Sequence, residues 1–168
     1  MMRKTLLRAA LAGALSAGLG LAHAQDATYN IRTLTPETAL KAAQAALKSC
    51  RDGGFQVAVA VVDRSGLAQV MLRDRFAGSH TPDTATRKAY TAVSFRTATS
   101  EMAKLIRSGQ LEPGLAQLPH TAMIGGGLMI EAAGSMVGGI GVSGAPGGDK
   151  DDECAKAGID AIRDKLDF

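Results

Sequence analysis

The feature that most constrains this chain is a pair of neighbouring apolar segments that are both broken by glycines. The segments are TAMIGGGLMIEA, residues 121–132, and GSMVGGIGVSG, residues 134–144, and a short turn joins them. Glycines inside a strand mark bulges or places where another backbone comes very close. Two such strands side by side predict a flat surface without side chains, on which a helix, a second subunit or a planar ligand can pack.

The second segment also contains Gly139-x-Gly141-x-x-Gly144, which is the spacing of a dinucleotide-binding fingerprint. That fingerprint requires a helix that opens at its third glycine inside a βαβ unit. Here Ala145, Pro146 and two further glycines follow, and the rest of the chain has room for one helix and no further strand. The chain also lacks the Gly-Lys-Ser/Thr of a P-loop, so the glycines do not predict nucleotide binding.

Residues 1–24 are typical of a secretory signal peptide. Three basic residues precede an uncharged apolar run over residues 9–22, and the sequence AHA forms a cleavage site just before Gln25. The run is shorter than the roughly 20 residues that a membrane span needs, and charges and turns interrupt every later apolar stretch. We therefore expect a periplasmic or secreted protein whose mature chain, residues 25–168, forms a single domain.

The charge balance argues against nucleic acid as a partner. The chain has 19 Lys and Arg residues against 16 Asp and Glu residues, and the three basic residues of the leader account for the whole excess. Proteins that bind nucleic acid normally carry a basic patch and aromatic side chains on which bases stack. This chain has no Trp, two Tyr and four Phe residues, so both signals are missing.

Helix and strand patterns follow one another along the mature chain. Thr35 and Pro36 start a helix that Gly53 ends, because Thr is a good N-cap and Pro is tolerated in the first turn. The run FQVAVAVVD predicts a strand that is covered on both faces, and the next segment returns as the second strand of a hairpin. The expected elements are strands over 55–63, 67–75, 121–132 and 134–144, and helices from Thr84 or Asp83 to Phe95, from about Ser100, and over 149–166.

An acidic cluster opens the last predicted helix. Its members are Asp149, Asp151, Asp152 and Glu153. The cluster is similar to a metal site, but acidic side chains are also favoured in the first turn of a helix because of the helix macrodipole. We interpret Asp149 as the helix cap and the other three as first-turn residues, and we predict no metal.

Four stretches resemble a known family. They are VAVVDRSG, RKAYTAVSF, IGGGLMI and GGIGVSGAPGGDKDDECAKAGIDAI, and they are similar to the GlcG/HbpS family of heme-binding proteins. The same module resembles the C-terminal domain of some corrinoid adenosyltransferases. The resemblance covers about residues 35–165 and implies a profilin-like α/β (α+β) domain, with a five-stranded antiparallel sheet and helices on both faces. It also implies homo-oligomers, often octamers, and heme as a cofactor in several members.

The resemblance bears on the two cysteines as well. Cys50 and Cys154 are too few and too far apart in sequence for a zinc site, and each lies on the apolar stripe of a predicted helix. In the fold that the resemblance implies, the first and last helices lie side by side. This implies a Cys50–Cys154 disulfide, with two buried free thiols as the alternative.

Heme iron takes His, Cys, Met or Tyr ligands. Outside the leader the chain has two histidines, His80 and His120, and each is followed by a threonine. The resemblance implies that at least one of them binds heme, and His80 is the first candidate. The alternative is that both are exposed loop histidines that bind no ligand. Basic residues near His80 are candidates for the heme propionates. The predicted heme-binding residues are His80, His120, Thr121, Arg75 and Arg87, with Arg73 and Lys88 as further propionate partners.

Enzymatic signatures are missing from the chain. It has no G-x-S-x-G elbow and no His-x-x-x-His pair, so any catalysis is expected to come from a bound cofactor. The sequence and the resemblance together predict an exported heme-binding protein that captures, senses or slowly degrades heme. The alternatives are a module that binds a small non-heme ligand or assists glycolate or corrinoid metabolism, and a purely structural oligomer.

Overall fold

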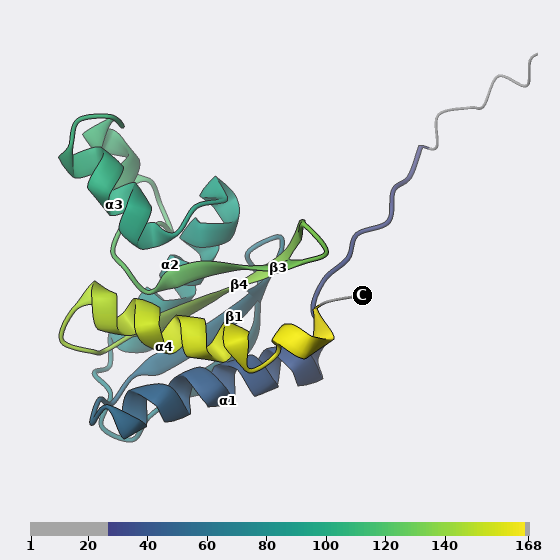
Figure 1. Ribbon diagram of the computed structural model, residues 1–168. Helices are drawn as coiled ribbons and strands as arrows, with labels where there is room; N and C mark the ends of the chain where they lie inside the picture. Colours follow the sequence, from purple (N-terminus) through teal and green to yellow (C-terminus); the bar gives the residue numbers. More distant parts are fainter. Residues whose placement is uncertain (1–26, 167–168) are drawn as a thin grey trace, which may run out of the picture. The chain divides into compact units, whose positions relative to one another are not determined.

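The computed structural model describes residues 27–166, in which one antiparallel sheet is covered by helices on both faces (Figure 1). The predicted leader, residues 1–24, lies outside the described residues. Residues 27–31 belong to a separate N-terminal unit, and everything from Arg32 onward belongs to one compact unit. Within the described residues, none of the helices combines the length and the apolar composition that a membrane span requires.

The sheet has four strands among the described residues, in the order β2-β1-β4-β3, and every neighbouring pair is antiparallel. The strands are β1 (Ala58–Asp63), β2 (Ala68–Arg73), β3 (Gly127–Ala132) and β4 (Ser135–Ser143). β1 lies inside the sheet, and all residues from Val57 to Val62 are completely buried. The prediction of a strand covered on both faces is therefore confirmed.

The five-stranded sheet that the resemblance implies is wrong for the described residues. The segment 121–132 enters the sheet only at Gly127, because Gly126 has a φ of +117° and breaks the extended line. At the other end of β3, a bulge leaves Val137 without a partner on β3. The Val137 carbonyl instead accepts a hydrogen bond from the Leu34 N–H. The segment before the first helix therefore contributes one backbone hydrogen bond to β4 and does not form a fifth strand.

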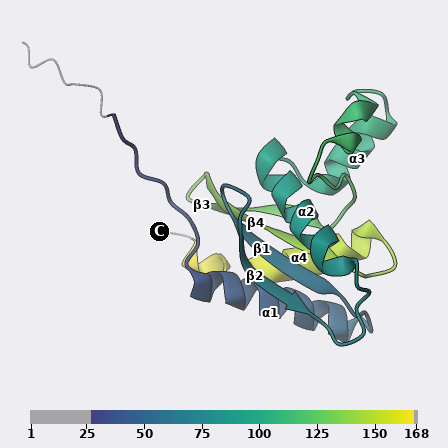
Figure 2. The same cartoon turned by 180° about the vertical axis from the view of Figure 1, so that it is seen from behind.

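The described residues form four α-helices, of which three pack on the sheet. The four are α1 (Pro36–Asp52), α2 (Thr81–Phe95), α3 (Thr99–Arg107) and α4 (Gly148–Asp160), and two short 3₁₀ helices cover Pro113–Gln117 and Arg163–Lys165. α1 and α4 lie side by side on one face, α2 covers the other, and α3 projects away from the sheet (Figures 1 and 2). The predicted N-cap of α1 is confirmed, because the Thr35 side chain accepts a hydrogen bond from the Thr38 N–H.

Two helix starts differ from the prediction. α2 begins at Thr81, earlier than expected, because Pro82 falls in the first turn, where a missing N–H costs nothing. His80 therefore occupies the N-cap position. α4 begins at Gly148 with Gly147 as its N-cap, so Asp149 lies inside the first turn and does not cap the helix. The final helix ends at Asp160, and a 3₁₀ turn continues the chain.

The glycine-rich strands form a surface on which α2 packs directly. A Cβ atom on Gly139 would lie 2.7 Å from Val93 Cγ1, and one on Gly141 would overlap the carbonyl oxygen of Ala85 and lie 2.7 Å from the Ala89 nitrogen. The helix backbone thus lies against the strand backbone without side chains between them. A helix, a second subunit and a planar ligand were predicted as partners of this surface, and the structure places a helix there.

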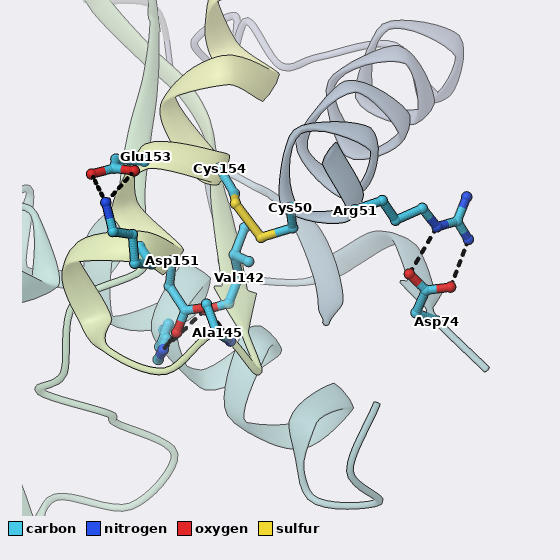
Figure 3. The surroundings of a disulfide bond; sticks show 10 residues. Cys50, Arg51, Asp74, Val142, Ala145, Asp151, Glu153 and Cys154 are labelled. Carbon is cyan, nitrogen blue, oxygen red and sulfur yellow. Dashed lines mark hydrogen bonds and ion pairs between the residues drawn. A yellow bond between two sulfur atoms is a disulfide. The ribbon is translucent and has the colours of Figure 1, made fainter. Parts of the chain in front are cut away.

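The opposite face of the sheet is closed by α1 and α4. A Cβ atom on Gly158 of α4 would lie 2.7 Å from the carbonyl oxygen of Ala42 in α1, so these helices cross closely. Cys50 and Cys154 form a disulfide, with Cα atoms 5.5 Å apart (Figure 3). The implied pairing is confirmed. In the chain-entropy picture, a bond that closes a loop of 104 residues contributes about 4–5 kcal/mol to stability.

We predict that Gly141→Ala destabilises the protein by about 1–3 kcal/mol, because the new methyl group pushes α2 off β4. Urea denaturation followed by circular dichroism measures the change in unfolding free energy. Gly114→Ala is the matched control, since a Cβ there has nothing within 4 Å, and its effect should stay within about 0.5 kcal/mol. Equal effects of the two substitutions would contradict the proposed close approach.

Candidate functional site

A pocket of about 670 Å³ lies at the N-terminal end of α2. Its walls come from five segments: the chain after α1, the loop before α2, α2 itself, the loop before β3, and the glycine-rich loop that leads from β4 into α4. The apolar part of the lining includes Phe55, Phe76 and Ile124. Phe76 and Ile124 are 79% and 54% exposed, which is unusual for such large apolar side chains. The pocket is therefore an open apolar surface with polar groups at its inner end.

The loop before α2 is held in place by a charged pair that reaches across to α1. Arg51 Nε and Nη2 donate hydrogen bonds of 2.8 and 2.7 Å to the two carboxylate oxygens of Asp74 (Figure 3). The Asp74 side chain is almost fully buried, and the Arg51 guanidinium holds its pKa below the usual range. Arg73 also donates to the Ala77 carbonyl. These bonds fix the segment that carries Phe76 into the pocket.

His80 lies in the pocket lining at the start of α2. Its side chain does not cap the helix, and its ring has no hydrogen bond to another described residue. A Cβ atom on Gly78 would lie 2.8 Å from His80 Cε1, so the glycine leaves the space that the ring occupies. The Thr81 hydroxyl donates to the Gly78 carbonyl and fixes the turn between them. The imidazole thus stands free at the edge of an apolar pocket.

The inner end of the pocket is formed by a buried ion pair. Lys88 Nζ lies 2.7 Å from Asp151 Oδ2, and both side chains are about 95% buried or more. Lys88 also donates to the Val142 carbonyl, and the Ala145 N–H donates to Asp151. Burial raises the pKa of Asp151, and the hydrogen bond and charge of Lys88 only partly oppose that rise. The charge of Lys88, expected to face a propionate, is therefore already balanced by Asp151.

The other predicted site residues separate into two groups. Arg75 is exposed and precedes Phe76 in the chain, but it is not among the residues that line the pocket. Arg87 instead donates from Nη2 to the Thr121 carbonyl at 2.7 Å, away from the pocket lining. Thr121 is buried, and its hydroxyl donates to the Leu118 carbonyl. His120 is exposed in the same loop with a φ of +63°. Of the predicted site residues, the structure therefore places His80 and Lys88 in the pocket lining, leaves Arg75 outside it, and holds Arg87, His120 and Thr121 in a second group.

Sequence reasoning missed most of the apolar lining and the buried pair. Phe76 and Ile124 lie in loops, and large apolar side chains in otherwise polar or glycine-rich loops were the available signal. The acidic cluster has a structural role: Asp151 pairs with Lys88, and Asp152 accepts a hydrogen bond from the Gly126 N–H. Within residues 27–166, no group of three His, Cys, Asp or Glu side chains is arranged to hold a metal ion.

Comparison with known proteins gives a consistent set of relatives. The profile of haem-degrading HbpS-like proteins matches residues 34–160. The solved structure of a double mutant of Streptomyces reticuli HbpS is 42% identical, with a TM-score of 0.77, and the match covers 87% of this chain and 98% of that one. A solved PduOC:heme complex is 27% identical, with a TM-score of 0.71, covering 77% of this chain and 95% of that one.

A longer relative matches over part of its length. The corrinoid adenosyltransferase PduO of Salmonella typhimurium is 31% identical over 121 residues, which make up 71% of this chain and 36% of that protein. The likeness to a module of a corrinoid adenosyltransferase, expected from the sequence, is confirmed. Because this chain spans only about a third of that enzyme, the match concerns a module of it and not the whole enzyme.

We predict that Lys88→Met costs about 3–5 kcal/mol of stability near neutral pH, because it leaves the Asp151 carboxylate buried and unpaired. Lys104→Met is the matched control, since Lys104 and Glu101 form an exposed pair at 3.5 Å. Its cost should be below about 1 kcal/mol. Chemical denaturation of the three proteins gives these differences.

The pH dependence of the Lys88→Met variant provides a second readout. An acid whose folded-state pKa is raised binds its proton more tightly when folded, so its protonation stabilises the protein. Loss of Lys88 raises the pKa of Asp151 further. The stability gap between parent and variant should therefore shrink as pH falls from about 7 toward the unfolded carboxyl pKa of about 4. A gap that stays constant or widens would mean that Asp151 is not the group left unpaired.

Proposed function

Because this chain belongs to the HbpS-like family, we propose that it is a heme-binding protein and that heme binds in the pocket at the N-terminal end of α2. The single observation that carries the proposal is the free imidazole of His80 at the edge of an apolar pocket. The PduOC:heme complex among its structural relatives supports heme as the ligand class. The role that follows is capture, sensing or slow degradation of heme.

The residues of the pocket fit a flat apolar ligand with a metal at its centre. A volume of about 670 Å³ lies within the usual range for pockets that bind small molecules. Phe55, Phe76 and Ile124 provide apolar contacts for a porphyrin ring. His80 provides a nitrogen ligand of the type that heme iron prefers. Bound heme would supply the redox and ligand-binding chemistry of its iron, and the protein's part is to bind and orient it.

Two features of the pocket orient the ligand. Lys88 and Asp151 close the inner end as a neutral pair, which offers little to a negatively charged group. Arg75 does not line the pocket, but it is exposed and adjoins Phe76, which does. We therefore place the propionates at the mouth, where they stay in water and meet Arg75. Arg87 and Thr121, which hold each other away from the pocket, take no part in this arrangement.

We also propose that the protein works outside the cytoplasm, as its first 24 residues predict. The buried Cys50–Cys154 disulfide supports this, because such bonds persist in oxidising compartments and are rare in reducing ones. Self-association, which the resemblance to the family implies, stays a prediction.

Titration with hemin tests the heme site. We expect a saturable Soret band with the parent protein and at least about tenfold weaker binding by His80→Ala, because the substitution removes the iron ligand. His120→Ala is the matched control and should bind as the parent does. Circular dichroism should show that both variants are folded.

Two results would contradict this assignment. If the parent gives no saturable Soret band, the chain acts as a non-heme ligand-binding module or a structural protein. If His120→Ala loses binding and His80→Ala keeps it, the ligand lies at the loop of residues 118–122 and not in the pocket.

Export is tested by expressing the full chain in a Gram-negative host. We expect the periplasmic fraction to contain a protein whose N-terminus, read by mass spectrometry, is Gln25. A matched variant with Ala22 and Ala24 both changed to Arg should remain uncleaved, because signal peptidase requires small residues there. A cytoplasmic protein that retains the leader would rule out export.

A further inference from the structure

A second cavity, of about 290 Å³, lies at the opposite end of α2 from the pocket that holds His80. It is bounded by the turn between β1 and β2, the residue that follows α2, and the hairpin of β3 and β4. Its charged lining residues are Arg64, Arg96 and Glu131. Its apolar lining residues are Met129 and Met136, which are both half-buried. The heme proposal uses none of these side chains.

The charged groups of this cavity are not engaged with the rest of the protein. Neither arginine side chain forms an ion pair or a hydrogen bond with another described residue, and the same is true of the Glu131 side chain. Of the seven other arginines in the described chain, five have a side-chain partner, among them Arg51, Arg73 and Arg87, and the exposed Arg75 and Arg107 have none. The distinctive feature of this cavity is that two free guanidinium groups line it together.

Arg96 is also held in a backbone conformation that an arginine rarely adopts. Its φ is +51°, in the left-handed region, where it ends α2 and its N–H donates to the Ala92 carbonyl. Glycine is the usual residue at such a position because it has no Cβ to clash. Strained residues of this kind cluster at ligand-binding sites. The position keeps a guanidinium where helix termination alone would favour glycine.

The charge of the cavity defines the ligand. Two guanidinium groups contribute two positive charges, Glu131 removes one, and the carbonyl end of α2 adds about half a negative charge. The balance is weakly positive, which suits a single negative charge and disfavours a doubly charged phosphate beside Glu131. Guanidinium groups bind carboxylates through paired hydrogen bonds, and the methionines offer a deformable apolar wall.

We propose that this cavity binds a small monocarboxylate with a short apolar tail, with Arg64 and Arg96 on the carboxylate and Met129 and Met136 on the tail. The site is independent of the heme pocket, because the two cavities share no lining residue.

Isothermal titration calorimetry of the full protein with sodium butyrate tests this site. We expect saturable binding that weakens about tenfold or more in Arg96→Gly and in Arg64→Gln. Arg96→Gly removes the guanidinium and suits the left-handed backbone, so its melting temperature should not fall. Arg107→Gln, which changes an exposed arginine at the end of α3, should bind butyrate as the parent does. Hemin binding should be the same in all four proteins.

Three results would overturn the proposal. One is the absence of saturable heat with butyrate. Another is binding of inorganic phosphate or of uncharged butyramide as tight as that of butyrate, since the cavity would then not select a monocarboxylate. The third is an equal loss of affinity in Arg107→Gln, which would indicate general attraction of anions. Because hemin binding is followed separately by its Soret band, failure of either proposal leaves the other intact.

Discussion

The structure depends on the direct contact between the backbone of α2 and the backbone of β4. Gly139 and Gly141 have no side chains, so the helix lies against the strand at a distance that any Cβ atom would prevent. Gly127 on β3 extends the same surface, where a Cβ would meet the Thr99 side chain and the Lys88 carbonyl. Close packing of this kind has no room to adjust. It fixes both the height of α2 above the sheet and the position of each end.

Both proposed binding sites lie at the ends of α2. Its N-cap residue, His80, lies at the edge of the larger pocket, and its middle carries Lys88 into the pair with Asp151 at the start of α4. Its last residue is followed by Arg96 at the smaller cavity. On the other face, the Cys50–Cys154 disulfide joins α1 to α4, and Arg51, next to Cys50, holds the loop that leads into α2 (Figure 3). The Arg51–Asp74 pair thus ties α1, on one face of the sheet, to the loop that leads into α2 on the other.

The parts of this structure that local patterns determine were predictable. The cap at Thr35, the buried run of β1 and the hairpins follow from residue types over a few positions, and the family resemblance implied the disulfide. The start of β3 was not predictable, because a single glycine with a positive φ, Gly126, decides where that strand begins. The residue patterns predicted the four strands that the described residues form, and the fifth strand came only from the family resemblance. The pocket was predictable only in part. His80 was identified, whereas the pairing of Lys88 with Asp151 joins residues 63 positions apart and leaves no local trace in the sequence.

The heme assignment requires that His80, at the start of α2, presents an iron ligand in the larger pocket. X-ray diffraction from crystals soaked with hemin, recorded at the iron absorption edge, tests this because iron is the element that gives a strong anomalous signal at that wavelength. We expect one strong iron peak within coordination distance of the His80 ring, about 2 Å from a ring nitrogen. An iron peak beside His120, or none in the pocket between the start of α2 and residues 144–148, would contradict it.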